Sequence, residues 1–254
     1  MQDSHPPFQI TRPEGRGLVV FACEHASKAI PAEFDDLGLT GAALSSHVAW
    51  DIGAMDLALA LSEIFDAPLV AGGVSRLVYD LNRPLEAASA IPETSEIFDI
   101  PGNTSLSASA RQARFDSYHQ PYHTALSDVL EARADAEIAL VTIHSFTPVF
   151  HGKTREVEIG FLHDDGAEFA KAALAAEEDA GRFRAALNEP YSAQDGVTYT
   201  LRKHGEARGL PTLMIEVRND LIDTPEAARE MAVHLSGTLQ KALQAMGRVA
   251  EVTR

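Results

Sequence analysis

The stretch "VVFACEHASKAIP" (residues 19–31) passes abruptly from an apolar run to charged and polar residues. Its first five residues are apolar and favour extended backbone, which is typical of a strand buried in a parallel sheet. Glu24 and His25 follow at once, and a turn of small residues leads to Pro31. Because open α/β sheets bind ligands at the carboxyl ends of their strands, this pair indicates a functional site.

The composition limits the class of protein. The chain has 254 residues, of which 45% are hydrophobic, and we expect one α/β domain over residues 1–254. Its net charge of −16 disfavours binding to nucleic acid or to an anionic membrane surface. No apolar run reaches the roughly 20 residues that span a bilayer, and the N-terminus lacks the layout of a signal peptide, so we expect a cytoplasmic protein. One cysteine excludes an internal disulfide and a cysteine-based zinc cluster, so any metal must be held by histidine and carboxylate.

Strand-like and helix-like segments alternate along the chain. Short runs rich in Val, Ile and Leu predict strands at 17–23, 67–73, 136–144, 156–163 and 211–217. Helical spacing predicts helices at 42–65, 107–134, 167–187 and 224–247, the last with Thr224 as N-cap and Pro225 as first residue. This alternation predicts a mainly parallel sheet with helices on both faces. The Pro- and Ser-rich segment 83–106 is long for a connection and predicts a binding loop or lid.

Three candidate site residues lie at strand ends. His25 follows the first predicted strand, His144 closes the third, and Glu216 lies near the end of the last. Two imidazoles and a carboxylate at one sheet edge are a common design of open catalytic zinc sites. A buried histidine taken alone is as readily a core residue, but the two together favour a divalent metal, most simply zinc. Arg218 would lie on the same side of the strand as Glu216, where it would contact an anion or pair with Glu216.

A second cluster lies in "VSRLVYDLNRP" (74–84). Arg76, Asn82 and Arg83 suit an anionic small molecule, because guanidinium groups bind carboxylates through paired donors and asparagine adds a directional donor. The alternative is an exposed turn in which the arginines and Asp80 neutralise one another.

Two pairs of residues that include histidine are spaced four residues apart, as on one face of a helix. His47 and Asp51 in "HVAWDIGA" would share one helix face, which lets Asp51 bind a metal or orient a histidine that does. The alternative is a surface pair beside Trp50. His119 and His123 have a proline between them, and we predict that they pack among aromatic side chains.

Cys23 and Glu24 also have two interpretations each. A cysteine near a histidine can be a nucleophile, but inside an apolar strand Cys23 is predicted to be a small buried hydrophobe. Glu24 would bind or tune a metal at His25, or would only pair with Lys28.

Taken together, the motifs resemble one known family, the N-formylglutamate amidohydrolases. The segments that carry the resemblance occur in order between about residues 17 and 222: "FACEHASKAIP", "HVAWDIGA", "SRLVYDLNRP", "YHQPYH", "TIHSFTP", "NEPYSAQDGVTYTLRKHGEARGLP" and "IEVRNDLI". The resemblance implies the phosphorylase/hydrolase-like fold of zinc carboxypeptidases, a mixed, mainly parallel sheet between helices. It also implies hydrolysis of N-formyl-L-glutamate to formate and glutamate in histidine breakdown.

The resemblance implies roles for single residues. His25 and His144 match metal ligands, and Glu216 matches the catalytic acid/base. Carboxypeptidases have a glutamate ligand three residues after the first histidine, where this chain has Lys28. The third ligand is therefore open, with Asp51 preferred and Glu24 as the second choice.

The substrate contacts follow from the same resemblance. Asn82 and Arg83 match the pair that holds a substrate carboxylate in zinc carboxypeptidases, and Arg76 matches an oxyanion-stabilising arginine.

We therefore expect a metal-dependent amidohydrolase with a small acidic substrate and no nucleic-acid or membrane partner. Two other functions fit the same residues. One is a deacylase of another small N-acyl amide, whose acyl pocket would depend on residues 83–106. The other is a metal-free binding protein for acidic small molecules. The sequence does not determine the oligomeric state.

Overall fold

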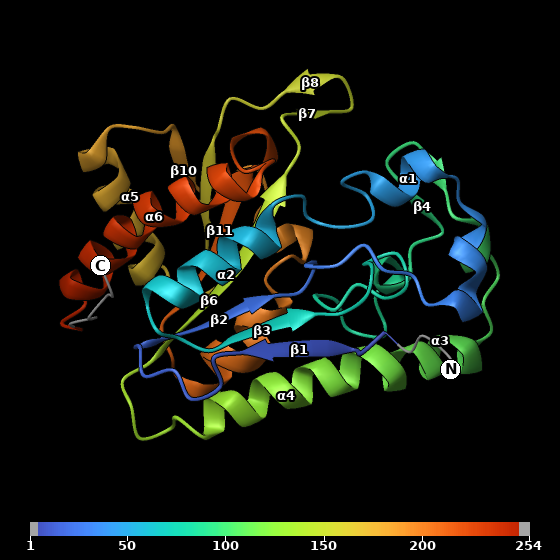
Figure 1. Cartoon of the computed structure of the whole chain (residues 1–254), viewed down its shortest axis with the longest axis horizontal. Helices are drawn as coiled ribbons and strands as arrows, with labels where there is room; N and C mark the ends of the chain where they lie inside the picture. The colour runs from blue at the N-terminus through green and yellow to red at the C-terminus, as the bar shows by residue number, and fades with distance from the viewer. Residues whose placement is uncertain (1–4, 249–254) are drawn as a thin grey trace.

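The computed structural model describes residues 5–248 and is built around a seven-stranded sheet (Figure 1). Its strand order is β1-β3-β2-β6-β11-β9-β10. The bounds of these strands are β1 (Phe8–Thr11), β2 (Val19–Cys23), β3 (Leu69–Gly72), β6 (Ala139–Phe146), β9 (Ile159–Leu162), β10 (Ala185–Leu187) and β11 (Thr212–Arg218).

The strand directions make the sheet mixed and mainly parallel. The central strands β3, β2, β6 and β11 are parallel to their neighbours within this set. Strand β1 is antiparallel to β3, β9 is antiparallel to β11, and β10 is parallel to β9. The carboxyl ends of the four central strands therefore meet at one edge, where α/β sheets bind their ligands. The predicted fold class is confirmed.

Helices cover both faces of the sheet (Figure 1). Helices α2 (Ala54–Ile64), α5 (Glu168–Ala180) and α6 (Pro225–Ala245) pack on one face, and α4 (Gln120–Glu131) packs on the other. Strand β2 is fully buried because its side chains alternate between the two cores. Val19, Phe21 and Cys23 belong to the first, and Val20 and Ala22 belong to the second.

All five predicted strands are present, but two further strands of the sheet were missed. Strand β1 lies in the N-terminal segment, where four residues give too short a pattern to detect. Strand β10 lies inside the helix predicted at 167–187, and that prediction is wrong at its end. Helix α5 stops at Gly181, whose φ of 63° is the left-handed conformation that commonly ends helices.

The helix predicted at 42–65 is also wrong as a single element. The structure has a short helix α1 (Gly41–Ser45), then irregular backbone, and then α2 from Ala54. Gly53 precedes α2 with a φ of 78°, and a Cβ there would lie 2.0 Å from the Ile222 carbonyl oxygen. His47 and Asp51 therefore do not share a helix face, because both lie in the irregular connection.

The other two helix predictions are confirmed in position. The predicted helix 107–134 consists of α3 (Ala108–Arg114), a π-helical turn η4 (Phe115–His119) and α4. Helix α6 begins after Thr224, whose hydroxyl accepts a hydrogen bond from the Ala227 amide at 3.1 Å, as the N-cap prediction requires.

The remaining elements are short. Two hairpins are formed by β4 (Thr94–Ser95) with β5 (Phe98–Asp99) and by β7 (Val149–Phe150) with β8 (Lys153–Thr154). Short helical turns occur at η1 (Ala32–Gly38), η2 (Ala88–Ala90), η3 (Pro101–Asn103), η5 (Ala193–Asp195), η6 (Leu201–Gly205), η7 (Glu206–Arg208) and η8 (Asn219–Leu221). Among the described residues, no helix combines the length and the apolar character needed to cross a membrane.

Candidate active site

Two histidines and an aspartate meet at the carboxyl edge of the sheet. His25 follows β2, His144 lies in β6, and Asp51 lies in the connection before α2, where its amide donates to the His25 carbonyl at 3.0 Å. The Asp51 Oδ2 atom is 2.8 Å from His144 Nδ1 and 3.3 Å from His25 Nδ1. All three side chains are buried. The same carboxylate oxygen therefore faces the Nδ1 atoms of both imidazoles.

Each imidazole meets a second carboxylate at its other nitrogen. His25 Nε2 is 2.7 Å from Asp80 Oδ1, and His144 Nε2 is 3.1 Å from Glu24 Oε2. Histidines that bind metals commonly donate their second N–H to a carboxylate, which fixes the tautomer and the ring orientation. Both rings are therefore held with Nδ1 toward Asp51.

The donor set fits a divalent metal. One ligand atom from each of His25, Asp51 and His144 can be chosen so that all three lie within 4.8 Å of one another. Two imidazoles and one carboxylate, with a further position open to water, are the usual protein ligands of a catalytic zinc ion. The preferred third ligand, Asp51, lies at the centre of this group, whereas Glu24 contacts the far side of His144.

The charges around the trio also favour a cation. Four buried carboxylates, those of Glu24, Asp51, Asp80 and Glu216, surround the two imidazoles. Within the described part of the chain, the guanidinium that forms ion pairs with this group is that of Arg76. A divalent ion would offset much of the remaining negative charge.

The pKa values of the trio follow from this arrangement. Burial disfavours the charged form of each group, but opposite charges nearby outweigh it. The imidazoles of His25 and His144 hold the pKa of Asp51 well below its ordinary value. In turn, Glu24 and Asp51 hold the pKa of His144 well above its ordinary value.

Glu216 differs from the other carboxylates of the site because it forms no ion pair with an imidazole or a guanidinium among the described residues. It lies in β11 opposite His144 of β6, and 5% of its surface is exposed. Its Oε2 atom is buried and has no hydrogen-bond partner among the described residues. Burial raises the pKa of Glu216 to about 7, and Asp51 adds to this effect. A carboxyl group with a pKa near neutrality can both accept and release a proton.

Arg76 contacts two carboxylates of the site. Its Nη1 atom donates to Asp51 Oδ1 at 3.2 Å, and its Nη2 atom donates to Asp80 Oδ2 at 3.0 Å. Its side chain is 30% exposed and lines the cavity described below. The predicted neutralisation of Arg76 by Asp80 is therefore present, but it lies inside the site and not on an exposed turn.

Asn82 and Arg83 are tied to the segment after η5. The Asn82 side chain accepts from the Thr200 amide at 3.0 Å and donates to the Val197 carbonyl. Arg83 Nη1 donates to the Gly196 carbonyl at 2.8 Å. Both residues line the same cavity as His25, Asp51 and His144.

Two other candidates have partners outside the trio. Arg218 pairs with Asp220 at 2.8 Å and Glu158 at 3.4 Å, so the alternative that it pairs with Glu216 is wrong. The Lys28 ammonium lies 5.4 Å from the centre of the Trp50 ring, and its predicted pairing with Glu24 is not formed.

Cys23 is fully buried and belongs to the core on the opposite face from Ala22. Because side chains alternate along a strand, its thiol points away from Glu24, as expected of a buried hydrophobe. His119 stacks on Phe115 with ring centres 4.5 Å apart, so the predicted aromatic packing is confirmed.

A cavity of about 390 Å³ opens onto the trio. Its wall includes Ser95 and Glu96 of the β4–β5 hairpin, so the predicted binding loop 83–106 does border the site. The Glu96 carboxylate is 2.9 Å from His47 Nε2 and links the hairpin to the connection that carries Asp51.

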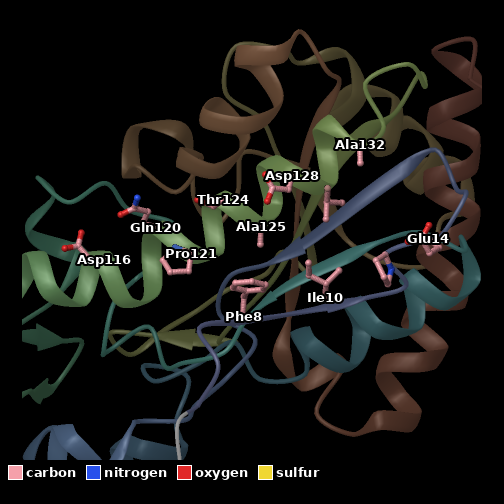
Figure 2. A pocket seen from close by; sticks show the side chains of 12 residues that line it. Phe8, Ile10, Glu14, Asp116, Gln120, Pro121, Thr124, Ala125, Asp128 and Ala132 are labelled. Atoms are coloured by element: carbon pink, nitrogen blue, oxygen red, sulfur yellow. The ribbon is translucent and has the colours of Figure 1, made fainter.

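A larger open groove of about 750 Å³ lies between β1 and α4 (Figure 2). Phe8 and Ile10 of β1 face Pro121 and Ala125 of α4 across it. Its described lining residues include no histidine, cysteine, lysine or arginine. The groove therefore has the carboxylates of Glu14, Asp116 and Asp128 in its lining but none of the imidazole or guanidinium groups that line the smaller cavity.

A family model matches residues 18–223 of this chain, and its description is N-formylglutamate amidohydrolase. The chain belongs to the N-formylglutamate amidohydrolase family. The resemblance inferred from the motifs is confirmed. No curated protein sequence matches the chain.

Two solved structures place this family member among its relatives. A gene product of Agrobacterium tumefaciens is 45% identical, with a TM-score of 0.94 over 96% of this chain and 97% of that chain. The N-formylglutamate amidohydrolase of Ralstonia eutropha JMP134 is 19% identical, with a TM-score of 0.67 over 96% of this chain and 99% of that chain. The second similarity shows a shared fold.

Sequence reasoning missed the part that two residues take in this family member's site. Asp80 was seen as a neighbour of Arg76, but its contact with His25 depends on how β2 and β3 pair. Tyr191 lines the cavity from the loop after β10, and the Arg155 guanidinium lies 4.8 Å from its ring centre. The signal for Tyr191 was its place in the motif "NEPYSAQDG".

Proposed function

We propose that this chain is a metal-dependent hydrolase of linear amides whose substrate is N-formyl-L-glutamate or a closely similar N-acyl amino acid. One observation carries the proposal. A buried carboxylate with a free oxygen, that of Glu216, lines the same cavity as a His25, Asp51 and His144 group that fits a metal. Family membership supports amide hydrolysis as the reaction class.

The metal would be held by the Nδ1 atoms of His25 and His144 and by Asp51. Zinc suits this donor set. When bound, such an ion lowers the pKa of a coordinated water and polarises the amide carbonyl. The chain itself would supply the proton transfers. Glu216, with its pKa near 7, would accept a proton from the attacking water and deliver it to the departing amine.

The arginines would act on the substrate's charges. Arg76, fixed between Asp51 and Asp80, would stabilise the charge that develops on the carbonyl oxygen. Arg83 and Asn82 would bind a carboxylate of the substrate at the other side of the cavity. Together with the bound metal, these arginines would let an acidic protein bind an acidic substrate, because the distant surface charge is screened by salt. Hydrolysis of an N-formyl amino acid would give formate and the free amino acid, as in histidine breakdown.

The decisive experiment is a hydrolysis screen of N-formyl and N-acetyl amino acids. Purified protein would be stripped with a chelator and reloaded with Zn²⁺, and release of the free amine would be measured. We expect hydrolysis that depends on added metal and is fastest for N-formyl-L-glutamate. Faster hydrolysis of a neutral N-acyl amide would show that the protein is a deacylase with a different substrate. Tight binding of acidic compounds without hydrolysis or bound metal would instead support a binding protein.

A further inference from the structure

Glu24 is a carboxylate at a buried strand end that the proposed reaction does not use. It directly follows β2, and its side chain lies on the same face of the sheet as Ala22 because side chains alternate. That face also carries Thr142 and His144 of β6, since Ala22 is paired with Thr142. The Glu24 side chain has no exposed surface. A buried charge of this kind is costly unless it has a partner.

The partner of Glu24 is His144. The Oε2 atom lies 3.1 Å from His144 Nε2, which is an ion-pair distance without the alignment of a hydrogen bond, and neither atom has a hydrogen bond to another described residue. Arg76, the nearest guanidinium of the site, is directed to Asp51 and Asp80 instead. The His144 imidazole therefore does most to offset the burial of the Glu24 carboxylate and to lower its pKa, and Thr200 and His25 add to the effect.

The positions of Asp51 and Glu24 around His144 make Asp51, and not Glu24, the candidate metal ligand. Asp51 approaches the Nδ1 atoms of His25 and His144, whereas Glu24 approaches the opposite nitrogen of His144. If His144 held a metal through Nδ1, its metal-binding nitrogen would be the one that faces Asp51. Glu24, which contacts Nε2, would then not be a ligand.

We infer that Glu24 is a positioning residue that fixes the tautomer and orientation of His144 through Nε2, so that Nδ1 is presented as a metal ligand beside Asp51. This inference rests on the metal site of the proposed function. Asp80 has the corresponding contact with Nε2 of His25. The acid that directly precedes His25 thus serves the other histidine, in the adjacent strand.

The chain offers a matched control. Glu177 in α5 is also fully buried and contacts an imidazole, with its two oxygens 2.7 and 2.9 Å from His234 Nε2 in α6. Replacing Glu177 with glutamine removes the same kind of buried charge. Neither Glu177 nor His234 lines the cavity of the site.

The test measures Zn²⁺ affinity by chelator competition and the visible spectrum of the Co²⁺-loaded protein. Glu24→Gln should weaken Zn²⁺ binding roughly 10- to 100-fold while keeping the Co²⁺ spectrum of three intact protein ligands. Asp51→Asn should weaken binding further and change the spectrum. Glu177→Gln should match the wild type in both measurements.

A second measurement needs no variant. In zinc-loaded wild-type protein with ¹⁵N-labelled histidine, His144 should carry its proton on Nε2 and its metal on Nδ1. A metal on Nε2 would overturn the inference even if Glu24→Gln failed to fold.

The outcomes separate the inference from the proposed function. Wild-type protein that binds no metal would overturn the proposed function and the role of Glu24 with it. Wild-type binding with equal affinity in Glu24→Gln would overturn the role of Glu24 alone. A Glu24→Gln protein that loses more affinity than Asp51→Asn, with a changed Co²⁺ spectrum, would make Glu24 a ligand and also overturn the inference.

Discussion

Glu216 is a buried carboxyl group of the cavity whose Oε2 atom has no hydrogen-bond partner among the described residues. Its carboxyl group is buried, one oxygen lacks a partner, and its pKa is raised to about 7 mainly by burial. Burying such a group without a partner costs free energy of folding, typically by about 1–3 kcal/mol. Arg218 does not offset this cost, because it pairs with Asp220 and Glu158. A purely structural role for Glu216 thus has no supporting contact.

The first residue-scale prediction is that Glu216→Gln separates catalysis from folding. Glutamine keeps the shape of the side chain but cannot exchange a proton near pH 7. We expect kcat to fall by roughly 10²- to 10⁴-fold, while bound Zn²⁺ and the thermal midpoint stay close to wild type. All three quantities should be measured on one preparation. A folded, metal-loaded variant with near-normal kcat would show that Glu216 does not move the proton.

At this scale the sequence was informative about which residues gather, and less so about their contacts. His25, His144 and Glu216 could be placed together because each is at the end of a predicted parallel strand. The hydrogen-bond and ion-pair partners of single atoms could not be predicted, because they depend on which face of the sheet each side chain occupies. Glu24 was expected to face Lys28 or a metal near His25, and it contacts His144 instead.

Among the elements, the connection between α1 and α2 matters most for the site. It was predicted as part of one helix because residues 42–65 carry the spacing of apolar residues that is typical of a helix. The pattern does not show that Gly53 adopts a φ of 78°, which interrupts the helix and turns Asp51 toward the histidines. A tertiary contact with Ile222 fixes this turn, and no local pattern encodes it.

The element-scale prediction concerns this turn. In Gly53→Ala the new Cβ would lie 2.0 Å from the Ile222 carbonyl oxygen, so the backbone would have to shift. We expect the free energy of unfolding to fall by more than the roughly 1 kcal/mol typical of alanine at positive φ, and Zn²⁺ affinity to fall because Asp51 moves. Chemical unfolding and chelator competition would measure the two effects.

Gly209→Ala is the control for Gly53→Ala. Gly209 has a φ of 68°, but a Cβ there would meet nothing within 4 Å. The Gly209→Ala variant should therefore lose only the stability that alanine costs at positive φ, without a steric clash, and its Zn²⁺ affinity should be unchanged. Equal losses of stability in the two variants would mean that the contact with Ile222 does not set the turn.

The whole molecule assembles its site from segments that are distant in sequence. Strands β2, β3, β6 and β11 are neighbours, so the segments at their carboxyl ends bring residues 24–25, 76–83, 144 and 216 to one edge. The sequence predicted these strands individually. It did not predict their order or the antiparallel pairing of β9, because both depend on long-range packing of segments that look alike locally.

Buried histidines give the whole molecule a second property, sensitivity to acid. His119, His123 and His204 are buried where η4, α4 and η6 meet. His123 Nε2 donates to the Leu81 carbonyl at 2.8 Å, so its Nδ1 must accept from His204 Nε2 at 2.7 Å. The two rings lie within 6° of parallel. This arrangement requires His123 to be neutral, and a second proton on His204 would lie on its buried Nδ1 atom, which has no hydrogen-bond partner among the described residues.

The pKa values of this cluster are lowered in the folded protein. Burial lowers the pKa of His204 to about 4, and Arg208 and Lys203 add to the effect while Glu24 opposes it. Burial likewise lowers the pKa of His119 to about 3. In the unfolded chain a histidine has a pKa of about 6.5. Between about pH 6.5 and 4 the unfolded state therefore binds more protons than the folded state, and stability must fall as the pH is lowered.

The whole-molecule prediction is that His204→Gln makes the metal-free protein less sensitive to acid. The glutamine amide can still donate to His123 Nδ1, but it does not titrate. For pKa values of about 4 folded and 6.5 unfolded, the His204 contribution lost between pH 7.5 and pH 5 is about 2 kcal/mol. Urea unfolding at the two pH values should show a fall in the free energy of unfolding that is smaller by this amount in the variant. An equal fall in both proteins would mean that His204 is already protonated in the folded state at pH 5, which its burial and the adjacent cations Arg208 and Lys203 oppose.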